Sequence, residues 1–158
     1  MIIWLEDRES TIRLLKKKLT NMGEIQLEIL SSPGAYKAFL EEKYPEGLKG
    51  KRKPLLLIDI MLHGVRDLSS IGIKNAPTLN GKHAGYVFAD RFLCSKESLW
   101  RGCQICFVTE RDIDSDLLSD INRLKKKSGT SVEILAKYSD SDFQKFQNMV
   151  AAWNENAS

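Results

Sequence analysis

The sequence has no hydrophobic run long enough to cross a membrane. A membrane-spanning helix needs about 20 consecutive apolar residues, whereas the apolar run at residues 1–5 is followed at once by two acids. This stretch has no basic leader and no small-residue cleavage site, so it does not have the pattern of a signal peptide. We therefore expect no membrane insertion and a cytoplasmic location.

Cysteine and histidine are scarce. Of three cysteines, Cys103 and Cys106 stand in an apolar run that is typical of a strand. Residues three apart on a strand point to opposite faces, so this pair cannot bind one metal ion, and we expect packing thiols. The two histidines, His63 and His83, have no third partner at ligand spacing, and we expect them at the surface.

Positively charged residues are in small excess over acidic ones, with a formal net charge of +3. The excess comes largely from three lysine-rich clusters, at residues 16–18, 49–53 and 125–127. No aromatic residues are interleaved with them and no nucleic-acid motif is present, so we expect solvated lysines rather than nucleic-acid binding. A P-loop is excluded because the sequence has no Gly-x-x-x-x-Gly-Lys.

The length and composition of the chain fit one globular domain. A chain of 158 residues can bury one core but is too short for two comfortable domains. Hydrophobic residues make up 42% and charged residues 28%, which argues against disorder. We expect a single domain over residues 1–158.

Apolar runs typical of strands alternate with segments of helical periodicity. The expected strands are Ile2–Leu5, Ile25–Leu30, Leu55–Ile60, Ile105–Val108 and Val132–Ala136. The expected helices run from Ser10 to Met22, Ala35 to Glu42, Gly85 to Leu93, Asp114 to Lys127 and Asp140 to Trp153. Leu117, Leu118, Ile121 and Leu124 form the expected inner face of the fourth helix.

This alternation predicts a doubly wound, five-stranded parallel α/β sheet flanked by five helices, because parallel neighbours need crossovers and helices must cover both faces. The glycine-punctuated segment 62–83 is longer than most loops of a compact domain. We expect it to be an insertion, a lid or a binding loop.

Polar residues close four of the expected strands. They are Glu6 and Asp7, then Asp59, Thr109 and Lys137. A carboxylate is costly to bury alone, so an acid at the end of an apolar run belongs at the carboxyl edge of the sheet, where loops open to solvent. The four strand ends therefore predict one site.

These residues, in this order, resemble those of the receiver domains of two-component signalling, and the resemblance covers nearly the whole chain. It implies the flavodoxin-like strand order 2-1-3-4-5. It also implies that Asp59 is the phospho-acceptor nucleophile, assisted by Thr109 and Lys137. On this resemblance the protein is a stand-alone response regulator in a phosphorelay. Its partners would be a sensor histidine kinase or a histidine phosphotransfer protein, a downstream protein target, and a second copy bound through the fourth and fifth helices.

The acids also imply a metal ion. Glu6, Asp7 and Asp59 would repel one another unless a hard cation binds, and oxygen ligands suit Mg²⁺. The resemblance adds the backbone carbonyl of Met61 as a ligand. The ammonium of Lys137 would neutralise phosphoryl oxygens in a loose, in-line transition state.

Two departures from the family pattern leave an alternative open. Ile134 stands three residues before the lysine, where the family usually has an aromatic residue, and segment 62–83 lengthens the loop after Asp59. A pseudo-receiver, which binds proteins without phosphorylation, would tolerate both. A haloacid-dehalogenase-type phosphohydrolase would need a second aspartate two residues after the nucleophile, where Met61 stands. We therefore expect no enzyme beyond self-phosphorylation and dephosphorylation.

Overall fold

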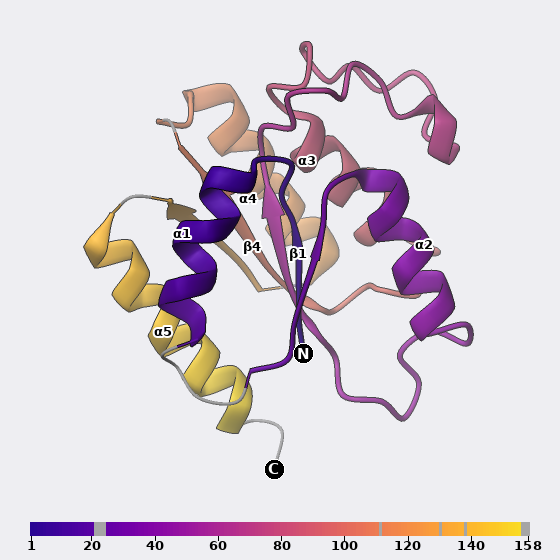
Figure 1. Cartoon of the computed structure of the whole chain (residues 1–158). Coiled ribbons are helices and arrows are strands. Elements are labelled where there is room, and N and C mark those ends of the chain that lie inside the picture. The colour runs from indigo at the N-terminus through magenta and orange to yellow at the C-terminus, as the bar shows by residue number, and fades with distance from the viewer. Residues whose placement is uncertain (21–24, 111, 130, 138, 156–158) are drawn as a thin grey trace.

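Five parallel strands form the centre of the molecule in a computed structural model that describes residues 1–20, 25–110, 112–129, 131–137 and 139–155 (Figure 1). The strands are β1 (Ile2–Leu5), β2 (Leu27–Leu30), β3 (Leu55–Asp59), β4 (Gln104–Thr109) and β5 (Val132–Ala136). Four of them match or lie within the strands expected from the sequence, and β4 extends one residue beyond the expected Ile105–Val108 at each end.

The sheet has the order β2-β1-β3-β4-β5, which is the predicted flavodoxin-like order. All four neighbouring pairs are parallel. Leu5 pairs with Ile58, Asp59 with Val108, and Thr109 with Ala136. The residues that follow these positions therefore emerge side by side at one edge of the sheet.

The helices between the strands are α1 (Glu9–Thr20), α2 (Pro33–Lys43), α3 (Ala84–Phe88), α4 (Ser115–Ser128) and α5 (Asp140–Glu155). Figure 1 shows α1 and α5 together on one side of the sheet and α2 on the other. The core divides in the same way, into one cluster with the buried side chains of α2, α3 and α4 and another with those of α1 and α5. Both faces are covered, as the continuous apolar strands predict.

The cysteines are packing thiols, as predicted. Cys103 belongs to the first core cluster and Cys106 to the second, so they face opposite sides of the sheet. Both are buried, and burial raises the pKa of the Cys103 thiol to about 12. These thiols stay protonated and unreactive at neutral pH.

Local signals explain where the helices begin. The Ser32 side chain accepts a hydrogen bond from the Ala35 N–H (3.1 Å) with Pro33 in the first turn, and Asp114 accepts one from the Leu117 N–H (2.8 Å). The first helix begins at Glu9, one residue before the expected start, and its expected end at Met22 lies outside the described residues.

One helix prediction needs correction and another is refined. Leu118 is 42% exposed and does not lie on the inner face of α4, because that face follows Leu117, Ile121 and Leu124 at helical spacing. The helix expected from Gly85 to Leu93 is confirmed: it is α-helical to Phe88 and continues as a π-helix over Ala89–Leu93.

Segment 62–83 is folded on itself. The Leu62 N–H donates to the Gly81 carbonyl (3.0 Å), and the buried Thr78 hydroxyl donates to the Arg66 carbonyl. Gly81 has a φ of +88°, and a Cβ there would lie 2.2 Å from the Leu62 carbonyl oxygen. A short 3₁₀ turn, η1 (Ser69–Ile71), completes the segment, which arches beyond the carboxyl ends of β1 and β3 (Figure 1).

Within the described residues, none of the helices combines the length and the apolar character that crossing a membrane requires.

Candidate functional site

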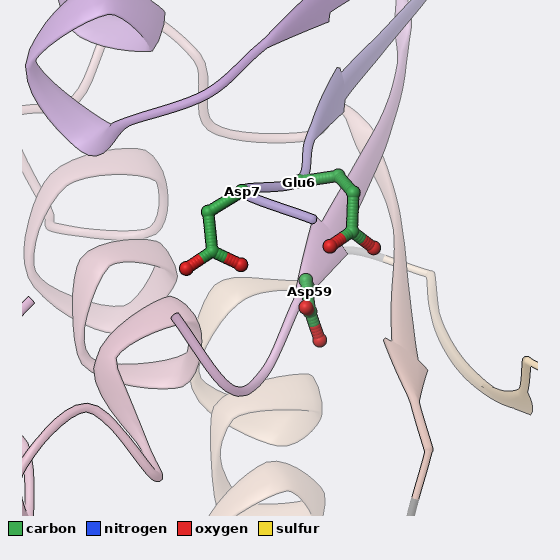
Figure 2. Close-up of side chains that lie close together, drawn as sticks. All are labelled: Glu6, Asp7 and Asp59. Carbon is green, nitrogen blue, oxygen red and sulfur yellow. The ribbon is translucent and has the colours of Figure 1, made fainter. Parts of the chain in front are cut away.

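The carboxyl ends of β1 and β3 bring three acids together. Glu6 and Asp7 directly follow β1, and Asp59 is the last residue of β3. One carboxylate oxygen from each lies within 4.8 Å of one from each of the others. Figure 2 shows the carboxylates of Glu6 and Asp7 on either side of that of Asp59. The acids predicted from the strand ends thus form one cluster.

Close packing of α3 against the end of β3 fixes the position of Asp59. The Gly85 N–H donates to the Ile60 carbonyl (3.0 Å), and a Cβ on Gly85 would lie 1.8 Å from the Asp59 carbonyl oxygen. Only glycine allows this approach. The Ile60 N–H donates to the Val108 carbonyl (3.1 Å), which continues the pairing of β3 and β4 past Asp59.

Lys137 contributes a buried positive charge to the cluster. It directly follows β5, and its N–H donates to the Thr109 carbonyl (2.8 Å). Its Nζ lies 2.7 Å from Asp59 Oδ2 and 2.7 Å from Glu6 Oε2. The lysine and these two carboxylates are almost completely buried. Burial opposes the charged lysine, but the Asp59 and Glu6 carboxylates outweigh it and raise the pKa of Lys137, which stays protonated.

Asp59 is held at both carboxylate oxygens. Oδ2 accepts a hydrogen bond from Lys137 Nζ, and Oδ1 accepts one from the Met61 N–H (3.2 Å). Burial raises the pKa of Asp59 to about 7, since it outweighs the opposing charge of Lys137, and the neighbouring Glu6 adds to the rise. The net negative charge of the cluster is therefore poorly compensated by protein groups alone.

This raised pKa predicts how stability varies with pH. Between about pH 4 and 7 folded Asp59 binds a proton that the unfolded chain has released, so the free energy of unfolding falls as pH rises through this range. The fall should be on the order of a few kcal/mol relative to Asp59→Asn, which cannot titrate there. Urea unfolding of both proteins from pH 4 to 8 measures it. Curves that stay parallel would contradict the raised pKa.

The donor set fits a hard divalent cation. Glu6, Asp7 and Asp59 offer only oxygen atoms, and Asp7 Oδ1 is buried and accepts no hydrogen bond. A buried carboxylate oxygen without a donor is unfavourable, and a cation would satisfy it. Met61, whose N–H binds Asp59, lies next to the cluster, where its carbonyl could add a ligand.

Thr109 and Ile134 lie on the neighbouring strands. Thr109 ends β4, is half-buried, and is joined through its carbonyl to the backbone of Lys137. Ile134 pairs with Phe107 in the sheet and packs, half-buried, against the core cluster of α2, α3 and α4. Its aliphatic side chain has no ring that could turn between exposed and buried positions.

His63 contacts the site, although sequence reasoning placed it only at the surface. Its side chain is 45% exposed, but its N–H donates to Asp7 Oδ2 (2.5 Å) and its Nδ1 lies 3.8 Å from Asp7 Oδ1. The base of segment 62–83 is therefore attached to one of the three acids. His83 lies elsewhere, with its Nε2 3.9 Å from Asp114 Oδ2.

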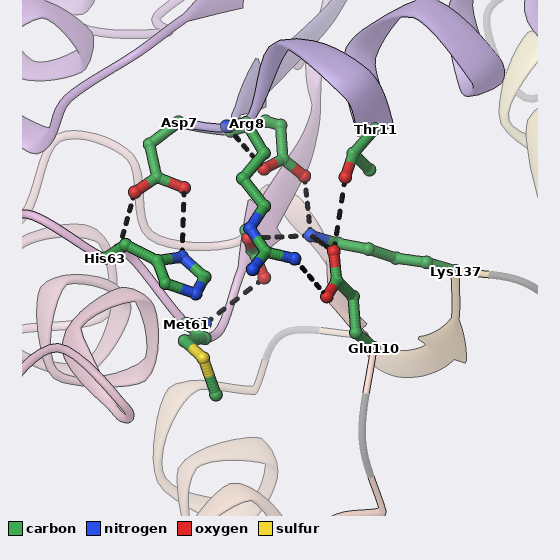
Figure 3. Close-up of polar contacts among 9 residues, drawn as sticks. Asp7, Arg8, Thr11, Met61, His63, Glu110 and Lys137 are labelled. Carbon is green, nitrogen blue, oxygen red and sulfur yellow. Dashed lines mark hydrogen bonds and ion pairs between the residues drawn. The ribbon is translucent and has the colours of Figure 1, made fainter.

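Sequence reasoning missed three more residues of the site, which Figure 3 draws with the others: Arg8, Thr11 and Glu110. Glu110 follows Thr109, and its carboxylate is ion-paired with Arg8 and accepts a hydrogen bond from the Thr11 hydroxyl (3.2 Å). Burial favours the neutral form of Glu110, but the hydrogen bond from Arg8 and the charge of Lys137 prevail and lower its pKa. Arg8 directly follows Asp7 and Glu110 directly follows Thr109. Their position next to predicted site residues was the only feature of the sequence that could have indicated them.

Comparison with known proteins identifies no family for this chain. Comparison with protein-family models gives no match, and a search of curated proteins gives none. The fold class, the acid cluster and the buried lysine are therefore the observations on which a function rests.

Proposed function

We propose that this protein is a stand-alone receiver-type phospho-acceptor, in which Asp59 takes a phosphoryl group from a phosphohistidine of a sensor histidine kinase or a phosphotransfer protein. The observation that carries the proposal is the 2.7 Å contact between Lys137 Nζ and Asp59 Oδ2, within a cluster of three carboxylates at the carboxyl edge of a 2-1-3-4-5 sheet. If Lys137 and Asp59 formed only a structural ion pair, the further acids Glu6 and Asp7 would have no role beside it.

The chemical step is an in-line displacement at phosphorus. A carboxylate oxygen of Asp59 forms a bond to phosphorus as the bond from phosphorus to the histidine nitrogen breaks. The electron pair of the broken bond stays on the imidazole, which takes a proton from solvent. The product is an acyl phosphate on Asp59.

The surrounding charges favour this step. Lys137 is held as a cation and would stabilise negative charge on the phosphoryl oxygens, where a preorganised ammonium is most effective. Glu6, Asp7, Asp59 and the Met61 carbonyl would hold Mg²⁺, which supplies further charge neutralisation when bound. The Thr109 hydroxyl, at the end of β4, would donate a hydrogen bond to the phosphoryl group.

Output would pass through protein contact on α4, β5 and α5. The exposed Leu118 gives α4 an apolar contact on its outer face. A downstream target or a second copy of this chain would bind there once phosphorylation shifts the population of surface shapes.

The test is phosphate uptake from a small acyl phosphate such as acetyl phosphate, followed by intact-mass spectrometry. With Mg²⁺ the wild-type protein should gain one phosphate, and a chelator should prevent the gain. Asp7→Asn removes a metal-binding carboxylate, so it should need at least about tenfold more Mg²⁺ for the same rate. Asp67→Asn, an exposed loop acid, is the matched control and should behave like wild type.

The alternative is a pseudo-receiver that binds proteins without phosphate. It is favoured by the attachment of Asp7 to the His63 N–H and by the aliphatic Ile134 in place of a ring that could rotate. A wild-type protein that gains no phosphate at any Mg²⁺ concentration would support it against the phospho-acceptor.

A further inference from the structure

An ion pair lies at the solvent side of the Asp59–Lys137 site. The Arg8 guanidinium pairs with the Glu110 carboxylate, and their side chains are 40% and 22% exposed. The Arg8 N–H also donates to Glu6 Oε1 (3.0 Å), which fixes its backbone beside the acid cluster. In Figure 3 the Arg8 side chain extends from the end of β1 toward Glu110, between the Asp7–His63 contacts and the Lys137–Glu110 contact.

Glu110 adds a further negative charge close to the buried lysine. Its Oε1 lies 3.7 Å from Lys137 Nζ, which already contacts Glu6 and Asp59. The Thr11 hydroxyl on α1 donates to the same oxygen of Glu110 (3.2 Å) and holds it there. Glu110 therefore lies close to both cations of the site, Arg8 and Lys137.

A phosphoryl group on Asp59 would change this balance. It adds roughly −1.5 to −2 charges and three strong acceptor oxygens at pH 7. Arginine binds phosphate and carboxylate groups alike through two parallel hydrogen bonds, and the greater negative charge of the phosphoryl group favours it over one partly exposed carboxylate. Phosphoryl oxygens and the Glu110 carboxylate would therefore compete for the same guanidinium.

We propose that Arg8 binds the phosphoryl group directly and that Glu110 is a positioning residue that competes for Arg8 in the unphosphorylated chain. This inference rests on the proposed function, because it requires an acyl phosphate on Asp59. On phosphorylation Arg8 transfers from Glu110 to the phosphoryl oxygens. Glu110 lies in the sequence between Thr109, the last residue of β4, and Asp114, the N-cap of α4. When Arg8 leaves Glu110, the change is therefore transmitted toward the start of α4. That route needs no aromatic residue at position 134.

Phosphate uptake from acetyl phosphate at fixed Mg²⁺, measured as a rate by intact-mass spectrometry, tests the roles of both residues. Arg8→Gln should slow uptake about tenfold, and Arg8→Lys, which keeps the charge, should recover part of the loss. Glu110→Gln should accelerate uptake several-fold, because it removes the competitor. The same change in an Arg8→Gln background should have a smaller effect, since Glu110 acts largely through Arg8.

The chain offers a matched control in Arg13 and Glu9, an exposed ion pair on α1 with a separation of 3.1 Å. Arg13→Gln and Glu9→Gln make the same charge changes and should leave the uptake rate as in wild type. Equal slowing by Arg13→Gln would reduce the Arg8 effect to general electrostatics and overturn the inference. So would wild-type uptake in Arg8→Gln, or slower uptake in Glu110→Gln.

The two proposals fail differently. If the wild-type protein takes up no phosphate, both fall together. If the wild type takes up phosphate at Asp59 and all Arg8 and Glu110 variants match it, the phospho-acceptor proposal stands and only the role of this ion pair is refuted.

Discussion

Asp59→Asn should reduce phosphate uptake from acetyl phosphate by at least about 1000-fold, because an amide is a poor nucleophile and forms no stable acyl phosphate. The variant should remain folded. Its amide keeps the shape of the carboxylate, and it removes a buried charge that burial and the neighbouring Glu6 disfavour. Intact-mass spectrometry after incubation with Mg²⁺ and the donor measures the loss, and urea unfolding at pH 7.5 checks the fold.

Asp67→Asn is the control for this change, since Asp67 lies in segment 62–83 and is fully exposed. It should take up phosphate at the wild-type rate. Uptake by Asp59→Asn at a rate near that of wild type would place the modification elsewhere and remove the basis of the proposed function.

Lys137→Met should both destabilise the protein and slow phosphoryl transfer. The ammonium lies 2.7 Å from a carboxylate oxygen of Glu6 and of Asp59, and all three groups are buried. Without it the Glu6 and Asp59 carboxyl groups lose their buried counter-charge, which costs about 3–5 kcal/mol of unfolding free energy. Loss of a preorganised cation at the phosphoryl oxygens should lower the rate roughly 100-fold to 1000-fold.

Urea unfolding and the uptake rate measure these two effects separately. Lys145→Met is the control, because Lys145 is an exposed lysine on α5 paired with Asp142 (2.9 Å), and it should change neither quantity appreciably. Should Lys137→Met fail to fold, Lys137→Arg keeps the charge and allows the rate to be measured. A Lys137→Met protein as stable and as fast as wild type would show that the buried ion pair contributes to neither stability nor transfer.

Much of the fold could be predicted because the strands are buried on both faces. Such strands are continuous apolar runs, and the β3 run, Leu55–Asp59, is buried throughout. The order of runs and helical segments then allows few topologies. The prediction for Leu118 was wrong because an apolar residue beside Leu117 lies about 100° away on a helix, and an exposed leucine costs little.

The site could be predicted only where strand geometry dictates it. Glu6, Asp7, Asp59 and Lys137 meet because parallel strands end at one edge of the sheet. The contact of Arg8 with Glu110 depends on how two long side chains, which follow β1 and β4 on either side of β3, extend toward each other, and no sequence spacing encodes that. The hydrogen bond from the His63 N–H to Asp7 depends on how segment 62–83 folds, and the weak periodicity of this segment predicts no structure.

The most direct test of the central claim is to locate the phosphate. Borohydride reduces an acyl phosphate on aspartate to homoserine, so treatment of the phosphorylated protein followed by peptide mass spectrometry identifies the modified residue. The account predicts homoserine at position 59 only, and only when Mg²⁺ and the donor were both present. Homoserine at another acid, or none after uptake of phosphate, would contradict the assignment of Asp59 as the phospho-acceptor.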